Sequence, residues 1–355
     1  MEGIIVKKFR KMTSFILVLC LVLTFYTFPV DSLQATGHTE IPSKKFLERV
    51  DNFISVRKGE QFKILSYIPL MRDDESIISY CFFLEPIGYV IIDNNTEIVE
   101  ASFMNTASYK ALKSTNKNIY YAGPLNYYTK ETSSYSDIVT KEKISIKDAT
   151  NYIKDYADNV ESAKQQVILE NQTANARNIT INMLSGTLRQ YSYNTGNICG
   201  STAAAIMLMY YRDYIDSYVV PSWHDTSTGE SLIELIRPQI NGDPPQGAFC
   251  SDVVRGLNYY FRWRGISNEY SSTWANGGMN EATYNTIRAQ IIANNPVEVL
   301  INDHPEYDDH FVVVHGIEKD VYISTYYFMY VGDGWGSNDV IISLRYLREY
   351  AYIVS

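Results

Sequence analysis

Cysteine and histidine are scarce in this chain. Its 355 residues include four cysteines and five histidines, and neither set has the close spacing that a zinc site requires. The sequence therefore predicts no metal site and no other cofactor. Beyond residue 35 the cysteines are odd in number and far apart, so they provide no disulfide framework. A Cys81–Cys250 pair would leave Cys199 as an unpaired thiol.

Basic clusters are also missing after the N-terminus. The chain has 31 basic and 40 acidic residues and a formal net charge of -9, so it lacks the basic patch of a nucleic-acid-binding protein. With 46% hydrophobic and 20% charged residues, the composition is that of a globular protein. A length of 355 residues allows one large domain or two ordinary ones.

The apolar run near the N-terminus is too short for a comfortable membrane span. Phe15–Phe28 contains 14 residues, against the roughly 20 that a spanning helix needs. A basic segment precedes the run and a polar one follows it, as in a secretory signal peptide. We therefore expect residues 1–35 to be a signal peptide, the protein to be secreted, and no stable membrane anchor to remain. An uncleaved anchor is the alternative.

Residues 36–135 have the pattern of a small α+β domain. Residues 42–55 show helical spacing with Ser43 as the N-cap. Four strand-like runs follow, at 62–70, 76–84, 88–93 and 96–103. Runs this close together favour an antiparallel meander with the helix packed on one face. Cys81, within the second run, is expected to be a buried core residue.

The rest of the chain divides into a linker and a second domain. Residues 136–180 are polar, lose the strand pattern and contain one predicted helix, which indicates a helical linker. In residues 181–355 helices come first and strands cluster late, so the predicted fold class of the whole chain is α+β. The helices are expected after Cys199 and at 231–240, 251–260 and 279–293, and the strands at 297–302, 310–317, 321–332 and 339–344.

The stretch GNICGSTAAAIMLMYY places Cys199 where a loop turns into an apolar helix. The thiolate, not the thiol, attacks a carbonyl, and a helix N-terminus favours negative charge. Apolar side chains at helical spacing predict one buried stripe, formed by Ala203, Ile206, Met207 and Tyr210. A structural cysteine could stand at the same place, so a nucleophile has to be argued from its partners.

A nucleophilic thiol needs a base, and His310 is the best placed of the histidines. It begins a predicted strand directly after the polar stretch DHPEYDD, so its ring can face the edge of a cleft. His315 is five residues further along, on the opposite face of that strand. His304 and His224 lie in predicted loops, where we expect them to be solvated.

Asp333 is the candidate that would orient the base. It ends the next predicted strand, where its carboxylate could accept the Nδ1–H of His310 and stabilise the imidazolium. Trp335 could then shield that hydrogen bond from water. A tight Asp-Gly turn is the alternative interpretation.

Gln190 is the candidate for an oxyanion hole. The backbone N–H of Cys199 would supply one donor, and a side-chain amide upstream would supply the second. Gln190 lies nine residues before the cysteine, while Asn194 and Asn197 are closer rivals.

This order of residues resembles the papain-like cysteine peptidase superfamily. NICGSTAAAIMLMYY is similar to the nucleophile helix of its bacterial streptopain-type and bacteriocin-processing (double-glycine) peptidase-like branches. IRAQIIANNPVEVLIN with DDHFVVVHGIE resembles their helix, turn and histidine-bearing strand, and DGWG resembles their Asn/Asp-x-Trp element. The likeness covers residues 187–344. It implies a papain-like domain over 181–355, in which the helix carrying the cysteine packs on an antiparallel sheet carrying the histidine. The roles it implies are Cys199 as nucleophile, His310 as base, Asp333 as orienting residue and Gln190 as oxyanion donor.

The N-terminal domain has a resemblance of its own. GYVIIDNNTEIVEASF and IYYAGPLNYY are similar to segments in the propeptides of streptopain-type enzymes. This resemblance implies that residues 36–135 pack on the peptidase domain as an intramolecular inhibitor.

The sequence thus predicts a secreted cysteine peptidase made as a zymogen, with a peptide or protein as its substrate. A transamidase or a cell-wall amidase on the same fold is one alternative. A non-catalytic surface binding protein is another, because a fold does not fix a function.

Overall fold

The computed structural model describes residues 42–167, 178–191, 193, 196–243, 245, 247–301, 310–321 and 324–355. The predicted signal peptide at 1–35, the loop that contains His304, and Asn194 lie outside these ranges. Within them, no helix is both long and apolar enough to cross a membrane.

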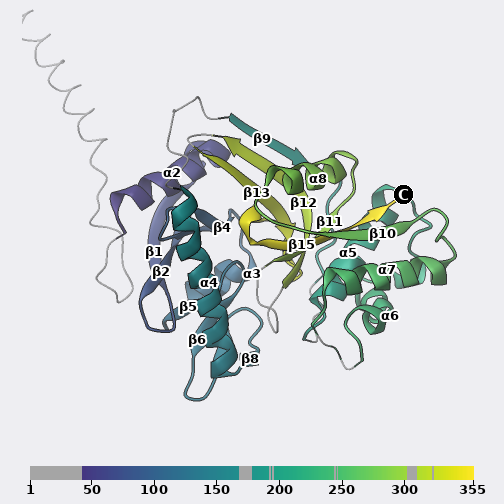
Figure 1. The fold of residues 1–355 in the computed structure, drawn as a ribbon, viewed down its shortest axis with the longest axis horizontal. Helices are drawn as coiled ribbons and strands as arrows, with labels where there is room; N and C mark the ends of the chain where they lie inside the picture. Colours follow the sequence, from purple (N-terminus) through teal and green to yellow (C-terminus); the bar gives the residue numbers. More distant parts are fainter. Residues whose placement is uncertain are drawn as a thin grey trace, which may run out of the picture.

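The strands of the described ranges form one sheet, shown in Figure 1. They are β1 (Lys63–Met71), β2 (Ile77–Glu85), β3 (Tyr89–Asp93), β4 (Ile98–Ser102), β5 (Ile119–Tyr121), β6 (Tyr127–Lys130), β7 (Tyr135–Asp137), β8 (Lys143–Ile144), β9 (Asn178–Met183), β10 (Ser271–Asn276), β11 (Val297–Ile301), β12 (His310–Val321), β13 (Thr325–Gly332), β14 (Val340–Ser343) and β15 (Leu347–Val354). Their order is β10-β15-β11-β12-β13-β14-β4-β3-β2-β1-β5-β6-β7-β8, with β9 paired to β12. The β1–β5 pair is parallel and the other pairs are antiparallel.

Helices lie at both ends of this sheet (Figure 1). They are α2 (Lys44–Lys58), α3 (Ala107–Ser114), α4 (Ile146–Val167), α5 (Cys199–Tyr214), α6 (Glu230–Ile240), α7 (Cys250–Arg264) and α8 (Glu281–Ile292). Short 3-10 turns are at Gly59–Gln61, Ser222–His224 and Leu344–Tyr346. The predicted α+β class is confirmed.

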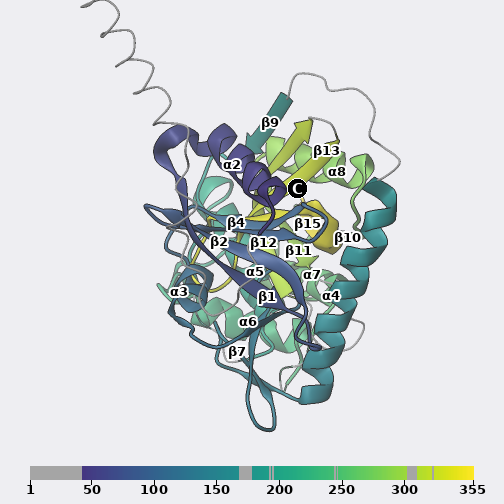
Figure 2. The same ribbon diagram turned by 90° about the vertical axis from the view of Figure 1, so that its left-hand side faces the viewer.

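The N-terminal meander is present as predicted. Strands β1 to β4 pair in sequence order, because each run alternates or is buried on both faces and the turns between them are short. Helix α2 packs against them through Val50, Phe53 and Ile54, in a cluster separate from the main core. Ser43 is the N-cap, although its side chain makes no capping hydrogen bond. Figure 2 shows α2 and the long helix α4 on this side of the molecule.

Two short strands occur where the sequence indicated a linker. Strands β7 and β8 contain three and two residues, and they extend the sheet beyond β6. Segments this short have no apolar alternation of their own, so their pairing with neighbours decides their conformation.

The sheet continues from the N-terminal region into the C-terminal region through β4 and β14. The partners are Ser102 with Val340, Ala101 with Ile341, and Glu100 with Ile342. One hydrophobic cluster likewise contains buried residues of both regions. The limits of the predicted segments, 36–135, 136–180 and 181–355, stay predictions.

The C-terminal region contains the four predicted helices, and α5 is buried more completely than expected. Every residue from Gly200 to Tyr211 is buried, not one stripe of the helix, because α5 lies between the sheet and other elements on all sides. The sequence did not indicate β10 and β15. Both strands are rich in polar or charged residues, and they pair with each other at the end of the sheet.

Candidate active site

Cys199 is the first residue of α5, as predicted. Gly200 brings this end of the helix close to the sheet, since a Cβ there would lie 3.4 Å from Cδ2 of Phe311 and 3.3 Å from Cγ2 of Ile240. The three cysteines of the described ranges form no disulfide, and Cys81 and Cys250 are both buried. Cys199 therefore keeps its thiol, which is half-buried at a helix start.

The pKa of the Cys199 thiol is raised, whereas a helix start alone was expected to favour the thiolate. Burial raises its pKa to about 11, although the backbone N–H groups of Phe311 and Gly200 hydrogen-bond to it and lower the pKa. The charge of Glu298 raises the pKa further. The favourable effect of the helix start is therefore outweighed by burial, and the thiol is protonated near pH 7.

His310 begins β12, next to the residue whose N–H reaches the Cys199 sulfur. Its Nε2 lies 2.7 Å from the backbone carbonyl oxygen of Asp333. A carbonyl only accepts, so Nε2 carries the hydrogen and Nδ1 of the neutral ring keeps a free lone pair. Burial lowers the pKa of His310 to about 4, and the hydrogen bond to Asp333 partly offsets this effect.

Asp333 contacts His310 through its main chain and not through its carboxylate, which corrects the prediction. The carboxylate Oδ1 accepts the backbone N–H of Trp335 at 2.8 Å and that of Ser337 at 2.9 Å. It thereby shapes the loop after β13, much as in the alternative interpretation of an Asp-Gly turn. Oδ2 is buried without a hydrogen-bond partner among the described residues, and burial raises the Asp333 pKa to about 6.

Trp335 covers the histidine. Its ring stacks on the His310 ring with 4.4 Å between centroids and an interplanar angle of 17°. An indole on one face of the imidazole keeps water from that face and from the hydrogen bond to Asp333.

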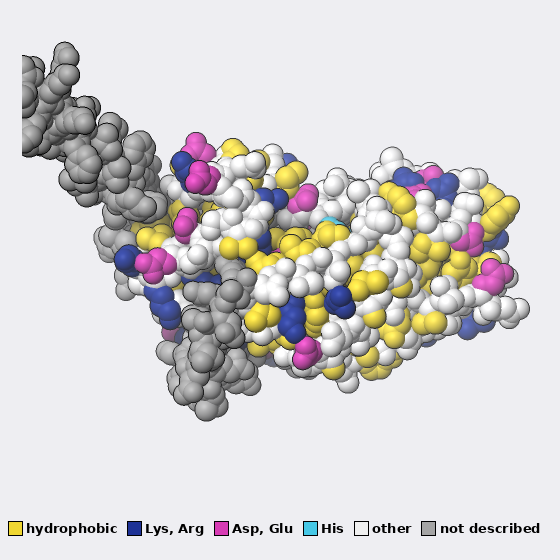
Figure 3. All heavy atoms as spheres, turned by 90° about the horizontal axis from the view of Figure 1, so that it is seen from above, with side chains coloured by type: hydrophobic (Ala, Val, Ile, Leu, Met, Phe, Trp, Pro, Cys, Tyr) yellow, Lys and Arg dark blue, Asp and Glu magenta, His cyan; other side chains and the backbone are white. Residues whose placement is uncertain are grey.

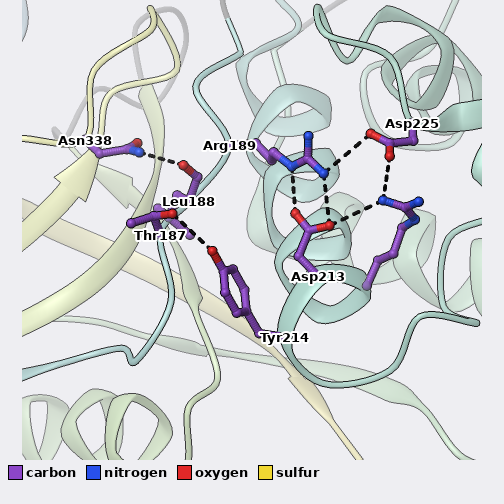
Figure 4. Close-up of polar contacts among 8 residues, drawn as sticks. Thr187, Leu188, Arg189, Asp213, Tyr214, Asp225 and Asn338 are labelled. Atoms are coloured by element: carbon purple, nitrogen blue, oxygen red, sulfur yellow. Dashed lines mark hydrogen bonds and ion pairs between the residues drawn. The ribbon is translucent and has the colours of Figure 1, made fainter.

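Gln190 lies in an irregular segment that precedes the cysteine loop, and its side chain is exposed. No hydrogen bond or ion pair within the described ranges joins it to Cys199 or His310. Figure 4 shows its neighbours fixed in place: Asn338 donates to the Leu188 carbonyl at 2.7 Å, and Arg189 pairs with Asp213. Asn197 is also exposed.

The other described histidines are hydrogen-bonded inside the fold. His315 Nε2 lies 2.7 Å from the Asn338 carbonyl oxygen, and His224 Nδ1 lies 2.8 Å from Ser231 Oγ. His224 is thus half-buried and paired, where the sequence suggested a solvated loop residue. On the face shown in Figure 3, a small patch of histidine surface lies among hydrophobic side chains near the middle of the molecule.

Sequence reasoning missed two residues at this site. Phe311 contributes its backbone N–H to the Cys199 sulfur, and Glu298 lies fully buried on β11, close enough for its charge to act on the thiol. Both carboxylate oxygens of Glu298 lack a hydrogen-bond partner in the described part of the chain. The one available signal was a lone acidic residue in the apolar run VEVLI. No group of three His, Cys, Asp or Glu residues that could hold a metal occurs among the described residues.

A thiol at a helix start, with a neutral imidazole on the neighbouring strand, is the arrangement of a cysteine-type hydrolase. The model of the Peptidase_C39 like family matches residues 164–351, just over half of the chain. The chain belongs to this family and is a cysteine-type peptidase of the papain-like superfamily, as the sequence predicted.

Two further comparisons with known proteins do not extend this assignment. No curated protein matches the chain. Among solved structures, the chain is similar to a fragment of Prevotella intermedia prointerpain A in a cysteine-to-alanine mutant, with 10% identity and a TM-score of 0.40. That likeness covers 79% of this chain and 97% of the other.

Proposed function

We propose that this peptidase hydrolyses peptide bonds of a peptide or protein substrate with Cys199 as nucleophile and His310 as base. Asp333 holds His310, and Gln190 donates to the oxyanion together with the Cys199 backbone N–H. The observation that carries the proposal is the meeting of two distant segments. The N–H of Phe311, the residue after His310, hydrogen-bonds to the Cys199 sulfur.

The tautomer of His310 supports the direction of proton transfer. Nδ1 takes the thiol proton as the sulfur attacks the carbonyl carbon, while Nε2–H stays on the Asp333 carbonyl. The imidazolium then gives its proton to the leaving amine, and the C–N bond breaks to leave a thioester. Water, deprotonated by the same nitrogen, hydrolyses the thioester and releases the thiol. Donors from Gln190 and Cys199 would stabilise the oxyanion in both steps.

The N-terminal region, 36–135, is proposed to restrain this site as an intramolecular inhibitor. Arg57 of α2 forms a buried ion pair with Glu318 and Asp320 of β12, the strand that carries His310. Beyond this region, in the predicted linker, Glu142 is also close to the cysteine loop: a Cβ on Gly196, three residues before Cys199, would lie 3.1 Å from Oε1 of Glu142. These contacts support a zymogen.

The resting charge state supports the same proposal. A thiol with a pKa of about 11 and an imidazole with a pKa of about 4 are both uncharged near pH 7. An active cysteine peptidase needs thiolate character, so this uncharged pair is the unreactive form expected of a zymogen. The signal peptide at 1–35 and secretion complete the proposal on the sequence pattern alone.

The test compares the chain without residues 1–35 with two variants, Cys199→Ala and Cys250→Ala, under reducing conditions. We expect the wild type to shorten to a C-terminal fragment and to carry an epoxide thiol inhibitor on Cys199. Cys199→Ala should stay whole and unlabelled, whereas Cys250→Ala should behave as the wild type because Cys250 is buried.

The outcomes separate the parts of the proposal. A wild type that takes the label but stays whole would keep the nucleophile and overturn self-processing. If Cys199 takes no label even after another protease has trimmed the N-terminal region, catalysis through Cys199 is wrong.

A further inference from the structure

The segment 184–191, which carries Gln190, is hydrogen-bonded at six successive positions, of which Figure 4 shows Thr187, Leu188 and Arg189. Its hydrogen bonds join Leu184 N to His315 O (2.8 Å), Ser185 N to Asn294 Oδ1 (2.9 Å), Gly186 N to Tyr210 Oη (3.1 Å), Thr187 Oγ1 to Tyr214 Oη (3.1 Å), Leu188 O to Asn338 Nδ2 (2.7 Å) and Arg189 Nε to Asp213 Oδ2 (2.6 Å). Gln190 differs from its neighbours, because its exposed side chain makes no hydrogen bond within the described part of the chain.

The contacts of the segment with α5 are made far from the nucleophile. They involve Tyr210, Asp213 and Tyr214, in the last turns of the helix that Cys199 begins. At the usual helical rise, these residues lie roughly 16–22 Å from the start of α5. These contacts attach the segment 184–191 to α5, but they do not determine its position relative to His310.

Asn338 supplies the contact on the histidine side of the site. It follows Asp333 and Trp335 in the loop after β13, and its carbonyl accepts the Nε2–H of His315, which lies on the His310 strand. Its amide Nδ2 donates to the Leu188 carbonyl, two residues before Gln190. Asn338 therefore joins the loop that holds His310 to the segment that holds Gln190.

Gly332 makes this contact possible. A Cβ at that position would lie 2.7 Å from Oδ1 of Asn338 and 3.2 Å from Cδ1 of Leu188. Glycine here lets both side chains approach the strand end just before Asp333, so the junction is tightly packed as well as hydrogen-bonded.

We propose that Asn338 is a positioning residue that sets the Gln190 amide relative to Cys199 and His310. This inference rests on the proposed function, in which Gln190 donates to the oxyanion. An oxyanion donor acts only within about 2.7–3.1 Å, and a misplacement of about 1 Å can cost about 100-fold in rate. A backbone displaced at Leu188 displaces Gln190 as well, because only Arg189 separates the two residues.

The test measures kcat and KM of the chain without residues 1–35 on a peptidyl coumarylamide that the wild type cleaves. The variants are Asn338→Asp, Gln190→Ala, the double variant, and Thr187→Val as matched control. Asn338→Asp keeps the shape but faces the Leu188 carbonyl with an acceptor. We expect kcat to fall about 10- to 100-fold with KM within about twofold.

Non-additivity is the decisive readout. If Asn338 acts through Gln190, the double variant has the same kcat as Gln190→Ala, which we expect to lose about 100-fold or more. Thr187→Val breaks a hydrogen bond of the same segment on the α5 side and should keep kcat within about twofold. Thermal unfolding of each variant checks that the fold is intact.

Three results would overturn the inference. One is additive losses in the double variant, and another is a Thr187→Val loss as large as that of Asn338→Asp. The third is full activity of Gln190→Ala beside an inactive Cys199→Ala, which would leave the proposed nucleophile standing. A wild type that cleaves no probe and takes no label on Cys199 would instead overturn the proposed function, and this inference with it.

Discussion

Glu100 on β4 in the N-terminal region and Glu298 on β11 in the C-terminal region are both fully buried in the same sheet. Glu100 is surrounded by donors. These are the hydroxyls of Tyr89, Tyr121 and Tyr127 and the backbone N–H of Leu125. Glu298 has no hydrogen-bond partner among the described residues.

The pKa values follow this difference. Burial raises the pKa of Glu100 to about 7, and its hydrogen bonds oppose a larger shift. Burial raises the pKa of Glu298 well above its usual range, with no hydrogen bond to oppose it. Glu100 is thus hydrogen-bonded where it is buried, whereas Glu298, near Cys199, has no hydrogen-bond partner among the described residues. Asp333 Oδ2, in the loop that holds His310, is another buried carboxylate oxygen without a hydrogen-bond partner among the described residues.

Glu100→Leu should have the largest effect on stability. Leucine has a similar volume, but it would leave three buried hydroxyls and one buried N–H without their acceptor. We expect the free energy of unfolding to fall by about 3–5 kcal/mol, measured by urea unfolding at pH 6. Glu100→Gln keeps an acceptor and should lose clearly less. A loss below about 1 kcal/mol for Glu100→Leu would show that the network does not stabilise the fold.

Glu298→Leu should change stability in the opposite direction. Replacing a buried acid that has no partner with an apolar side chain should raise the free energy of unfolding by about 1–3 kcal/mol. The folded protein holds this proton, whereas the unfolded chain releases it above about pH 4.5. The wild type therefore loses stability as the pH rises above that value.

The pH dependence is the control for this second substitution. The gain from Glu298→Leu should be larger at pH 8 than at pH 5, because leucine has no proton to lose. Urea unfolding at both pH values measures the difference. If Glu298→Leu is less stable than the wild type at both pH values, the carboxyl group of Glu298 has hydrogen-bond partners in solution. The contrast with Glu100 then disappears.

The local part of this structure could be predicted from the sequence. Apolar alternation indicated β1 to β4, and the change from a glycine-containing loop to an apolar run indicated that α5 starts at Cys199. The strand beginning at His310 was predicted in the same way. Each of these elements is decided by side chains a few residues apart, so its signal is contained within its own window.

The contacts between distant segments could not be predicted. The β4–β14 pairing joins strands about 240 residues apart, and no local pattern specifies it. Whether Asp333 binds His310 through a carbonyl or a carboxylate depends on how its loop closes on Trp335 and Ser337. The burial that raises the pKa of Cys199, and the full burial of Glu298, follow from packing that the sequence does not display.

Glu298→Gln should have the smallest effect, and it acts on Cys199 itself. An ionised Glu298 repels the thiolate, although burial is the larger cause of the raised Cys199 pKa. Glutamine keeps the shape and removes the charge, so the Cys199 pKa should fall by a fraction of a unit. Alkylation by iodoacetamide should then be about two- to threefold faster at pH 9–10 and unchanged near pH 5, where Glu298 is protonated.

Glu349→Gln is the matched control for this last substitution. Glu349 lies on β15 opposite Leu300, and its carboxylate accepts the Cys250 N–H at 3.1 Å. Its charge is not among the main causes of the Cys199 shift, so its removal should leave the alkylation profile unchanged. Equal acceleration in both variants would mean that the thiol responds to the overall charge of this region. If alkylation is no faster in Glu298→Gln, the buried acid lowers stability without acting on the nucleophile. The contrast between Glu100 and Glu298 would then concern folding alone.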